Sequence, residues 1–197
     1  MTLPEAEPRS PAVTAVVLCG GAGRRFGSDK TRAVLGDVTV LDALVSSLPG
    51  GWDVLCVGPE RPVERPAVRW TREDPPGGGP VAGVAAALRE VRAPVTVLLG
   101  GDMPYAGPAA SELAAALAAD TGVEAVVGRD GDGTLQPLLA AYRTSALRAA
   151  LPPEPAGTPL RRLLDGLRVR AVSLPDGTSL DVDTPDDLER ARPRLDP

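Results

Sequence analysis

The sequence predicts an α/β fold with a single open, mostly parallel sheet flanked by helices. Short apolar stretches of strand character alternate along the chain with stretches in which apolar residues recur at helical spacing. The apolar stretches are short and continuous, which is typical of strands buried on both faces. Loops that begin with glycine follow two of them, at 20–30 and 100–105. These loops would stand outside the carboxyl ends of the strands, where open α/β sheets bind their ligands.

The individual elements follow from local composition. We predict strands at 13–19, 53–57, 68–70, 93–99 and 123–128, and helices at 38–48, 80–92, 107–120 and 145–151. The segments REDPPGGGP and RDGDGT are predicted to be a loop and a turn, because glycine, proline and aspartate interrupt regular structure. From about residue 129 the alternation becomes less regular, which predicts a smaller β-rich insertion or a sheet edge that holds a second substrate.

Composition narrows the chemistry. A chain of 197 residues fits one domain and buries roughly 70% of its unfolded surface. The absence of histidine excludes histidine-dependent triads and zinc hydrolases, so the candidates are carboxylates, lysine, arginine, backbone amides and a metal held by oxygen. The net charge of −5 offers no general affinity for nucleic acid or for an anionic membrane. No apolar run reaches the roughly 20 residues that a membrane-spanning helix needs.

We expect the domain to occupy residues 13–191, between a disordered lead-in at 1–12 and a tail at 192–197. The lead-in carries acids and prolines where a signal peptide has a basic and then an apolar region. Cys19 and Cys56 lie in apolar runs and form no C-x-x-C pair. They are predicted to be buried free thiols, which favours the reducing cytoplasm.

The stretch LCGGAGRRFGSDKT at 18–31 predicts a phosphate-binding loop. Its glycines do not have the G-x-G-x-x-G spacing of a dinucleotide-binding turn, because Gly27 comes one residue late. A P-loop has glycine directly before its lysine, whereas two residues separate Gly27 from Lys30, the only lysine of the chain. We therefore expect a long loop in which backbone amides face an anion while Arg24, Arg25 and Lys30 supply positive charge.

This stretch resembles the signature of the nucleotidyltransferases similar to molybdenum cofactor guanylyltransferase, roughly L-x-G-G-x-x-x-R-[MF]-G-x-D-K. The resemblance implies a Rossmann-like nucleotidyltransferase fold with a small β-rich acceptor-side region. It also implies that the loop wraps the triphosphate of a nucleotide, and that Arg24 and Lys30 neutralise it and serve catalysis. Binding of the nucleotide would then involve Leu18, Gly20, Gly21, Gly23, Arg24 and Lys30. Four such motifs occur in the family's order between about residues 13 and 191.

Carboxylates supply the predicted metal site. Asp102 follows a buried strand and two glycines, which suits a Mg²⁺ ion that keeps waters and contacts phosphate oxygens, although an aspartate there can also cap a turn. LLGGDMPY resembles the family segment whose aspartate is a catalytic Mg²⁺ ligand that also contacts the nucleotide. Asp181 and Asp183 are spaced to share one face, and the resemblance implies that the residue before Thr184-Pro185 completes the metal site. An aspartate stands there in place of the usual asparagine.

The residues after that aspartate predict a helix start. Thr184 is the expected N-cap, proline follows at the first helical position, and Asp187 completes a capping box. We expect Asp186 and Asp187 to be structural.

Two further segments carry the resemblance. REDPPGGGPVAG places Asp74 at the family position that contacts the nucleobase and Gly79 in the adjoining turn. One carboxylate can accept both N1–H and N2–H of guanine, which favours guanine over cytosine. The asparagine that known guanylyltransferases carry after their second strand is absent, since this region reads VGPERP. TPLRRLL resembles the acceptor side, where Arg161 and Arg162 bind the pterin phosphate or, alternatively, belong to a solvated helix face.

The function implied is Mg²⁺-dependent transfer of GMP from GTP to the phosphate of molybdopterin or molybdenum cofactor, without a covalent enzyme intermediate. The partners implied are these small molecules, together with transient contact with molybdenum cofactor enzymes or delivery proteins. A cytidylyltransferase of the same fold and a non-catalytic nucleotide-binding regulator stay open as alternatives. An NAD-dependent redox enzyme is disfavoured by the glycine spacing.

Overall fold

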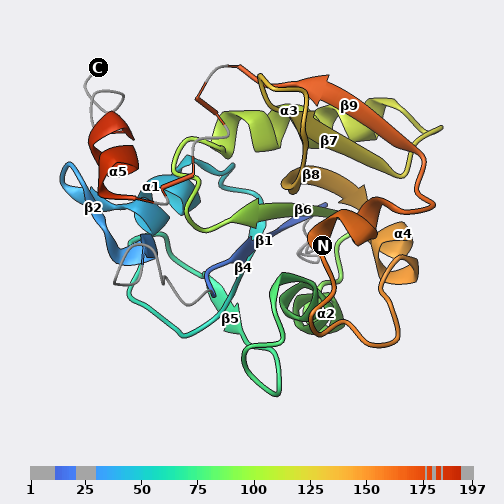
Figure 1. The fold of residues 1–197 in the computed structure, drawn as a ribbon, viewed down its shortest axis with the longest axis horizontal. Coiled ribbons are helices and arrows are strands. Elements are labelled where there is room, and N and C mark those ends of the chain that lie inside the picture. The colour runs from blue at the N-terminus through green and yellow to red at the C-terminus, as the bar shows by residue number, and fades with distance from the viewer. Residues whose placement is uncertain (1–11, 21–29, 176, 179–180, 183, 192–197) are drawn as a thin grey trace, which may run out of the picture.

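A seven-stranded sheet forms the centre of the molecule (Figure 1). The computed structural model describes residues 12–20, 30–175, 177–178, 181–182 and 184–191. The strand order is β5-β4-β1-β6-β8-β7-β9, and neighbouring strands are parallel except where β8 pairs with β6 and β7. The predicted open, mostly parallel sheet is therefore confirmed. The strands are β1 (Val13–Leu18), β4 (Asp53–Val57), β5 (Arg69–Thr71), β6 (Val95–Gly100), β7 (Ala125–Arg129), β8 (Leu135–Arg143) and β9 (Val169–Ser173).

Strand β1 occupies a central position although it comes first in the chain. It pairs in parallel with β4 and β6, so that Val17 lies in register with Cys56 on one side and Leu99 on the other. Because these strands are parallel, their carboxyl ends share one edge of the sheet. The loops that follow β1 and β6 are thus brought together as predicted.

Helices cover both faces of the sheet (Figure 1). On one face, α1 (Val40–Ser47) and α3 (Gly107–Ala119) pack over a core that includes Ala15 and Leu113. On the other, α2 (Pro80–Glu90), α4 (Thr144–Ala149) and the 3₁₀ helix η2 (Leu160–Leu164) pack over a second core that includes Val16. Successive residues of β1 point to opposite faces, so a continuous apolar strand serves both cores.

A third, smaller core lies at the carboxyl edge of the sheet. Here the hairpin of β2 (Val34–Leu35) and β3 (Val38–Thr39) packs with α5 (Pro185–Ala191) around Leu35, Val40 and Val182. The short 3₁₀ helix η1 (Lys30–Arg32) precedes the hairpin. The hydroxyl of Tyr105 donates a hydrogen bond to the carbonyl of Ala191, which ties α5 to the loop after β6.

Most predicted elements are present, with shifted ends. The helix predicted at 38–48 begins at Val40, because Thr39 is its N-cap and accepts a hydrogen bond from the amide of Asp42 at 3.1 Å. The predicted turn after β7 is confirmed, since the amide of Gly133 donates to the carbonyl of Asp130 at 3.0 Å. The irregular part after residue 129 forms the edge of the main sheet rather than an insertion, because β7, β8 and β9 all join it.

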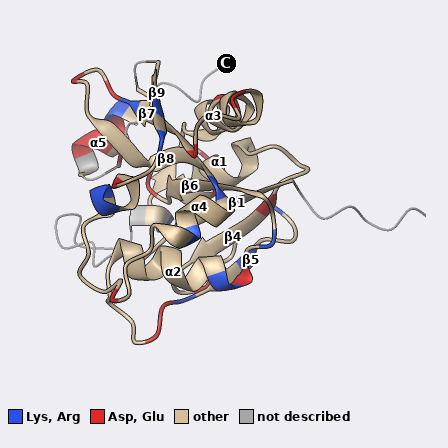
Figure 2. Cartoon of the chain, turned by 90° about the vertical axis from the view of Figure 1, so that its right-hand side faces the viewer, with Lys and Arg blue, Asp and Glu red and all other residues tan. Residues whose placement is uncertain are grey.

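The charged side chains of the described residues are distributed over several elements (Figure 2). At the β9 edge, Arg168 pairs with Glu124 at 3.3 Å and Arg170 with Asp120 at 3.2 Å. These pairs hold the edge strand against the segment that precedes β7. Within the described ranges, no helix is long and apolar enough to cross a membrane. The predicted lead-in, apart from Ala12, and the predicted tail lie outside the described residues.

Candidate functional site

The loops that follow β1 and β6 are joined by a backbone hydrogen bond. The amide of Gly101 donates to the carbonyl of Leu18 at 2.9 Å. A Cβ atom at Gly101 would lie 3.1 Å from that carbonyl oxygen and 3.2 Å from both Cys19 Sγ and Thr31 Cγ2. Glycine is needed here because the backbones approach so closely. Leu18 and Gly20, two predicted nucleotide-binding residues, therefore lie in a segment adjoining the loop that carries Asp102.

Asp102 is half-buried at the end of β6 and is joined to the segment before α5. A Cβ atom at Gly100 would lie 2.6 Å from Asp102 Oδ1, so the carboxylate folds back over this glycine. The carbonyl of Asp102 accepts a hydrogen bond from the amide of Val182 at 3.0 Å. Val182 is buried and Asp181 is exposed. Two of the predicted metal ligands, Asp102 and Asp181, thus come from adjoining segments.

The third predicted ligand, Asp183, lies outside the described residues. Within the described ranges, no group of three or more cysteine, aspartate or glutamate side chains is gathered as for a metal ion. The described part of the site therefore offers individual carboxylates rather than a closed metal cage.

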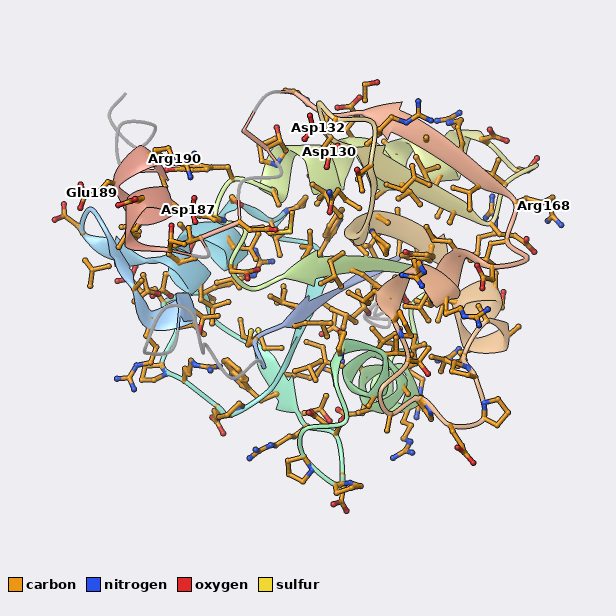
Figure 3. All side chains as sticks on the ribbon, in the orientation of Figure 1. Asp130, Asp132, Arg168, Asp187, Glu189 and Arg190 are labelled. Atoms are coloured by element: carbon orange, nitrogen blue, oxygen red, sulfur yellow. The ribbon has the colours of Figure 1, made fainter. Side chains whose placement is uncertain are left out.

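The predicted helix start at Thr184 is confirmed. The amide of Thr184 donates to Asp187 Oδ2 at 2.8 Å, and the amide of Asp187 donates to Thr184 Oγ1 at 3.2 Å. Asp187 also accepts a hydrogen bond from Arg190, which lies beside it on α5 (Figure 3). Asp187 is only 8% exposed and its carboxylate is occupied by the cap, so its role is structural as predicted.

The glycine-rich loop is described only at its two ends. Gly20 follows β1, and Lys30 begins η1. The structure describes the backbone of Lys30 but not its side chain. The predicted residues Gly21, Gly23 and Arg24 also lie outside the described residues.

The loop between β5 and α2 lies at the same edge of the sheet. Glu73 accepts a hydrogen bond from the amide of Gly77 at 3.1 Å, which holds the turn, while Asp74 is exposed. Gly79 has φ +87°, a conformation that favours glycine, and stands directly before Pro80 at the start of α2. Since β5 is separated from β1 by β4, Asp74 belongs to the same edge as Gly20 but follows a strand two positions away.

The predicted acceptor residues occupy a different part of the fold. Arg161 and Arg162 are exposed on η2, which covers the α2 face of the sheet. Arg162 pairs with Asp165 at 3.1 Å. In the described part of the chain, no hydrogen bond or ion pair joins either arginine to the loop of Asp102.

One residue that no sequence motif predicted reaches this edge. Arg61 follows β4 and is half-buried, and its Nη2 donates to the carbonyl of Cys19 at 3.1 Å. The sequence offered one signal, an arginine within the segment VGPERP after a buried strand.

The turn between β7 and β8 also stands at the carboxyl edge (Figure 3). The carboxylate of Asp130 accepts hydrogen bonds from the amides of Thr134 at 2.8 Å and Asp132 at 3.0 Å, and from Gln136 Nε2 at 2.7 Å. The hydrogen bond from Thr134 is the largest of the causes that lower the pKa of Asp130 below its ordinary value. These hydrogen bonds order the turn.

Comparison with known proteins identifies the family. The model of the MobA-like NTP transferase domain matches residues 15–172, which include the sheet and both glycine-containing loops. The chain belongs to the family of MobA-like NTP transferases. Membership in this family confirms the enzyme class, nucleotidyltransferase, that the resemblance of the sequence implied.

Individual MobA-like proteins agree with this. A protein of Natronomonas pharaonis named "Probable molybdenum cofactor guanylyltransferase" is 31% identical over 201 residues, which cover 92% of this chain and 98% of the relative. The crystal structure of molybdopterin-guanine dinucleotide biosynthesis protein A from Archaeoglobus fulgidus has a TM-score of 0.70 at 24% identity, over 92% of this chain and 97% of that one. A Mycobacterium tuberculosis protein in complex with manganese has a TM-score of 0.67 at 21% identity, over 93% and 99%. The two structures show the shared fold.

Proposed function

We propose that this MobA-like NTP transferase transfers GMP from GTP to the phosphate of molybdopterin or molybdenum cofactor. The observation that carries the proposal is the hydrogen bond of 2.9 Å from Gly101 N–H to the Leu18 carbonyl. It sets the loop of Asp102 against the residues that open the glycine-rich loop. A carboxylate loop beside a segment whose sequence carries several glycines, two arginines and a lysine suits a nucleotide triphosphate with a bound divalent ion.

The reaction needs no nucleophile from the protein. An oxygen of the acceptor phosphate forms a bond to the α-phosphorus of GTP, while the bond from that phosphorus to the oxygen bridging to the β-phosphate breaks. Pyrophosphate leaves with the electron pair. The protein contributes positioning and charge neutralisation. We assign the neutralisation to Arg24 and Lys30, and part of the backbone contacts to Gly20, Gly21 and Gly23.

The donors fit Mg²⁺ as the resident ion. Mg²⁺ commonly binds one or two carboxylates and keeps waters and phosphate oxygens as its other ligands. Asp102 and Asp181 supply carboxylates from adjoining segments, and we assign Asp183 as a further ligand. The bound ion would neutralise phosphate charge and orient the triphosphate. The manganese complex of the M. tuberculosis protein of the same fold supports a divalent ion.

Recognition of the base and of the acceptor is assigned to two different segments. We assign guanine to Asp74, whose exposed carboxylate can accept from both N1–H and N2–H, with Gly79 shaping the adjoining turn. We assign the acceptor phosphate to Arg161 and Arg162. Because no hydrogen bond or ion pair among the described residues joins η2 to the loop of Asp102, this assignment requires that the acceptor extends across the α2 face of the sheet.

We place the reaction in the cytoplasm, with the pterin passing to molybdenum enzymes or delivery proteins by transient contact. Cys19 and Cys56 are both buried free thiols, as predicted, which agrees with a reducing compartment.

The test measures pyrophosphate release from GTP with molybdopterin and Mg²⁺, and thermal stabilisation by GTP, CTP and NAD. GTP should stabilise the protein, and only with Mg²⁺. Asp102→Asn should lower the turnover about a hundredfold or more, because a neutral amide is a weaker ligand and leaves phosphate charge uncompensated. Asp186→Asn is the matched control, an exposed carboxylate in the first turn of α5 whose loss should leave turnover unchanged. Wild-type turnover in the Asp102 variant would refute its role, and stabilisation by CTP alone would identify a cytidylyltransferase.

A further inference from the structure

The side chain of Arg61 holds the peptide group between Cys19 and Gly20. Its Nη2 donates to the Cys19 carbonyl at 3.1 Å, and its Nη1 donates to the carbonyl of Pro59 at 3.0 Å. The hydrogen bond to Pro59 holds the guanidinium against its own loop. The group that donates to the Cys19 carbonyl is therefore itself held in place. Hydrogen bonds from a charged donor are about twice as strong as those between neutral groups.

The end of β4 and Gly58 after it make two further contacts here, one with the preceding Leu18–Cys19 peptide group and one with the Cys19–Gly20 group itself. The amide of Cys19 donates to the carbonyl of Val57 at 2.8 Å. Gly58 has φ +142°, and a Cβ atom there would lie 3.1 Å from both Cys19 C and Gly20 N. Only glycine allows this approach. The segment 57–61 therefore encloses the peptide group where β1 ends.

This enclosure determines where the amide of Gly20 points. The N–H and C=O bonds of a trans peptide group point in opposite directions. With its carbonyl held by Arg61, the peptide must direct the Gly20 N–H away from Arg61. Among the described residues, this N–H has no hydrogen-bond partner, and Gly20 is exposed. An exposed, fixed amide next to the loop of Asp102 is a donor for an anion.

We propose that Arg61 is a positioning residue that aims the Gly20 amide at the triphosphate of the bound nucleotide. The inference rests on the proposed function and adds a residue to it. Arg61 acts through the Cys19 carbonyl rather than on the base. Its loss should therefore weaken binding of the triphosphate chain whatever base is attached.

The test measures the dissociation constants of GTP and of inorganic tripolyphosphate, with Mg²⁺, by titration calorimetry. Arg61→Ala should weaken both ligands by the same factor, about ten- to a hundredfold, the range expected for one misdirected charge-assisted contact. Arg61→Lys keeps one donor and should restore part of the loss. Arg129→Ala, an exposed arginine with no side-chain partner in the described part of the chain, should bind both ligands like the wild type.

A second variant separates an action through the peptide group from direct contact with phosphate. Gly58→Ala keeps Arg61 but displaces the same peptide group, and it should also weaken tripolyphosphate. The double variant should lose little more than either single one, because both changes act on one amide. Thermal unfolding of each variant without ligand shows whether it is folded, and a folded Arg61→Ala protein with weakened binding supports the inference.

Four results would overturn it. The first three are that Arg61→Ala binds tripolyphosphate as the wild type does, that it loses binding of GTP alone, and that its losses are fully additive with those of Gly58→Ala. In these cases GTP binding by the wild type leaves the proposed function intact. A wild type that binds neither ligand overturns both proposals. Arg61-dependent binding of tripolyphosphate without binding of GTP supports the role of Arg61 and refutes the proposed nucleotide.

Discussion

Adding one methyl group at Gly101 should disturb both stability and the site. In Gly101→Ala the new Cβ would lie 3.1 Å from the Leu18 carbonyl oxygen, 3.2 Å from Cys19 Sγ and 3.2 Å from Thr31 Cγ2. All three are closer than ordinary van der Waals contact. Thr31 is only 6% exposed, and the Leu18 oxygen is held by the Gly101 amide itself. No single small shift relieves the three contacts together.

Overpacking of this kind costs about 1–3 kcal/mol. For a domain of this size each kcal/mol lowers the melting temperature by about 2–4 °C, so Gly101→Ala should melt about 2–12 °C below the wild type. Gly51→Ala is the matched control, because nothing lies within 4 Å of the added methyl and the residue does not have a positive φ. It should melt at the wild-type temperature or slightly above.

Circular dichroism of both variants during heating decides the matter. If Gly101→Ala has the same melting temperature as Gly51→Ala, the two loops separate easily and the contact between them is not rigid. Turnover by the folded fraction of Gly101→Ala should fall as well, because the methyl group moves the peptide that precedes Asp102.

Two further predictions concern side chains away from this contact. Arg65 donates to four carbonyl oxygens at the end of α1 and in the turn beyond it, at 2.7–3.3 Å; Arg65→Ala should lower the free energy of unfolding in urea by about 2–4 kcal/mol, and Arg129→Ala by less than about 0.5 kcal/mol. Equal losses would contradict this. Burial raises the pKa of Asp53, but hydrogen bonding and charge from Arg69 outweigh it and leave the pKa below its ordinary value. The unfolded state therefore binds more protons near this pH. The Asp53–Arg69 pair stabilises the fold fully above about pH 4, and this stabilisation is lost as the pH falls through the pKa that Asp53 has in the folded protein. Urea unfolding between pH 2 and 6 should show a shallower decline for Asp53→Asn, and parallel curves would refute the assignment.

The sequence predicted the layers of the fold because its core strands carry a strong local signal. β1, β4 and β6 are mostly apolar, and glycine or proline stands within two residues of each of their ends, so their type follows from composition. β8 was not predicted as a strand, because it contains Pro137. The register with β7 shifts at this point, where Val127 faces Ala140 and Gly128 faces Gln136. The bulge places the proline where no bond to β7 is required.

The sequence also predicted which loops come together. Gly20 and Asp102 could be placed together because the carboxyl ends of parallel strands meet at one edge. The hydrogen bonds of Arg61 to Cys19 and of Val182 to Asp102 join residues far apart in the chain. No local pattern encodes such contacts, since they depend on how loops fold over the finished sheet. Arg162 is a further example. The sequence shows Asp165 three residues after it, but not that, among the described residues, Arg162 makes no bond to the loop of Asp102.

The hydrogen bond between Val182 and Asp102 has a consequence for the order in which the protein matures on the ribosome. The two residues are separated by some 80 positions, so at roughly 5–20 residues per second the second emerges roughly 4–16 s after the first. During that interval the sheet around β1 can already assemble, since β4 and β6 precede residue 102. The nascent chain would thus pass through a stage in which the central strands are paired while the loop of Asp102 still lacks its neighbour.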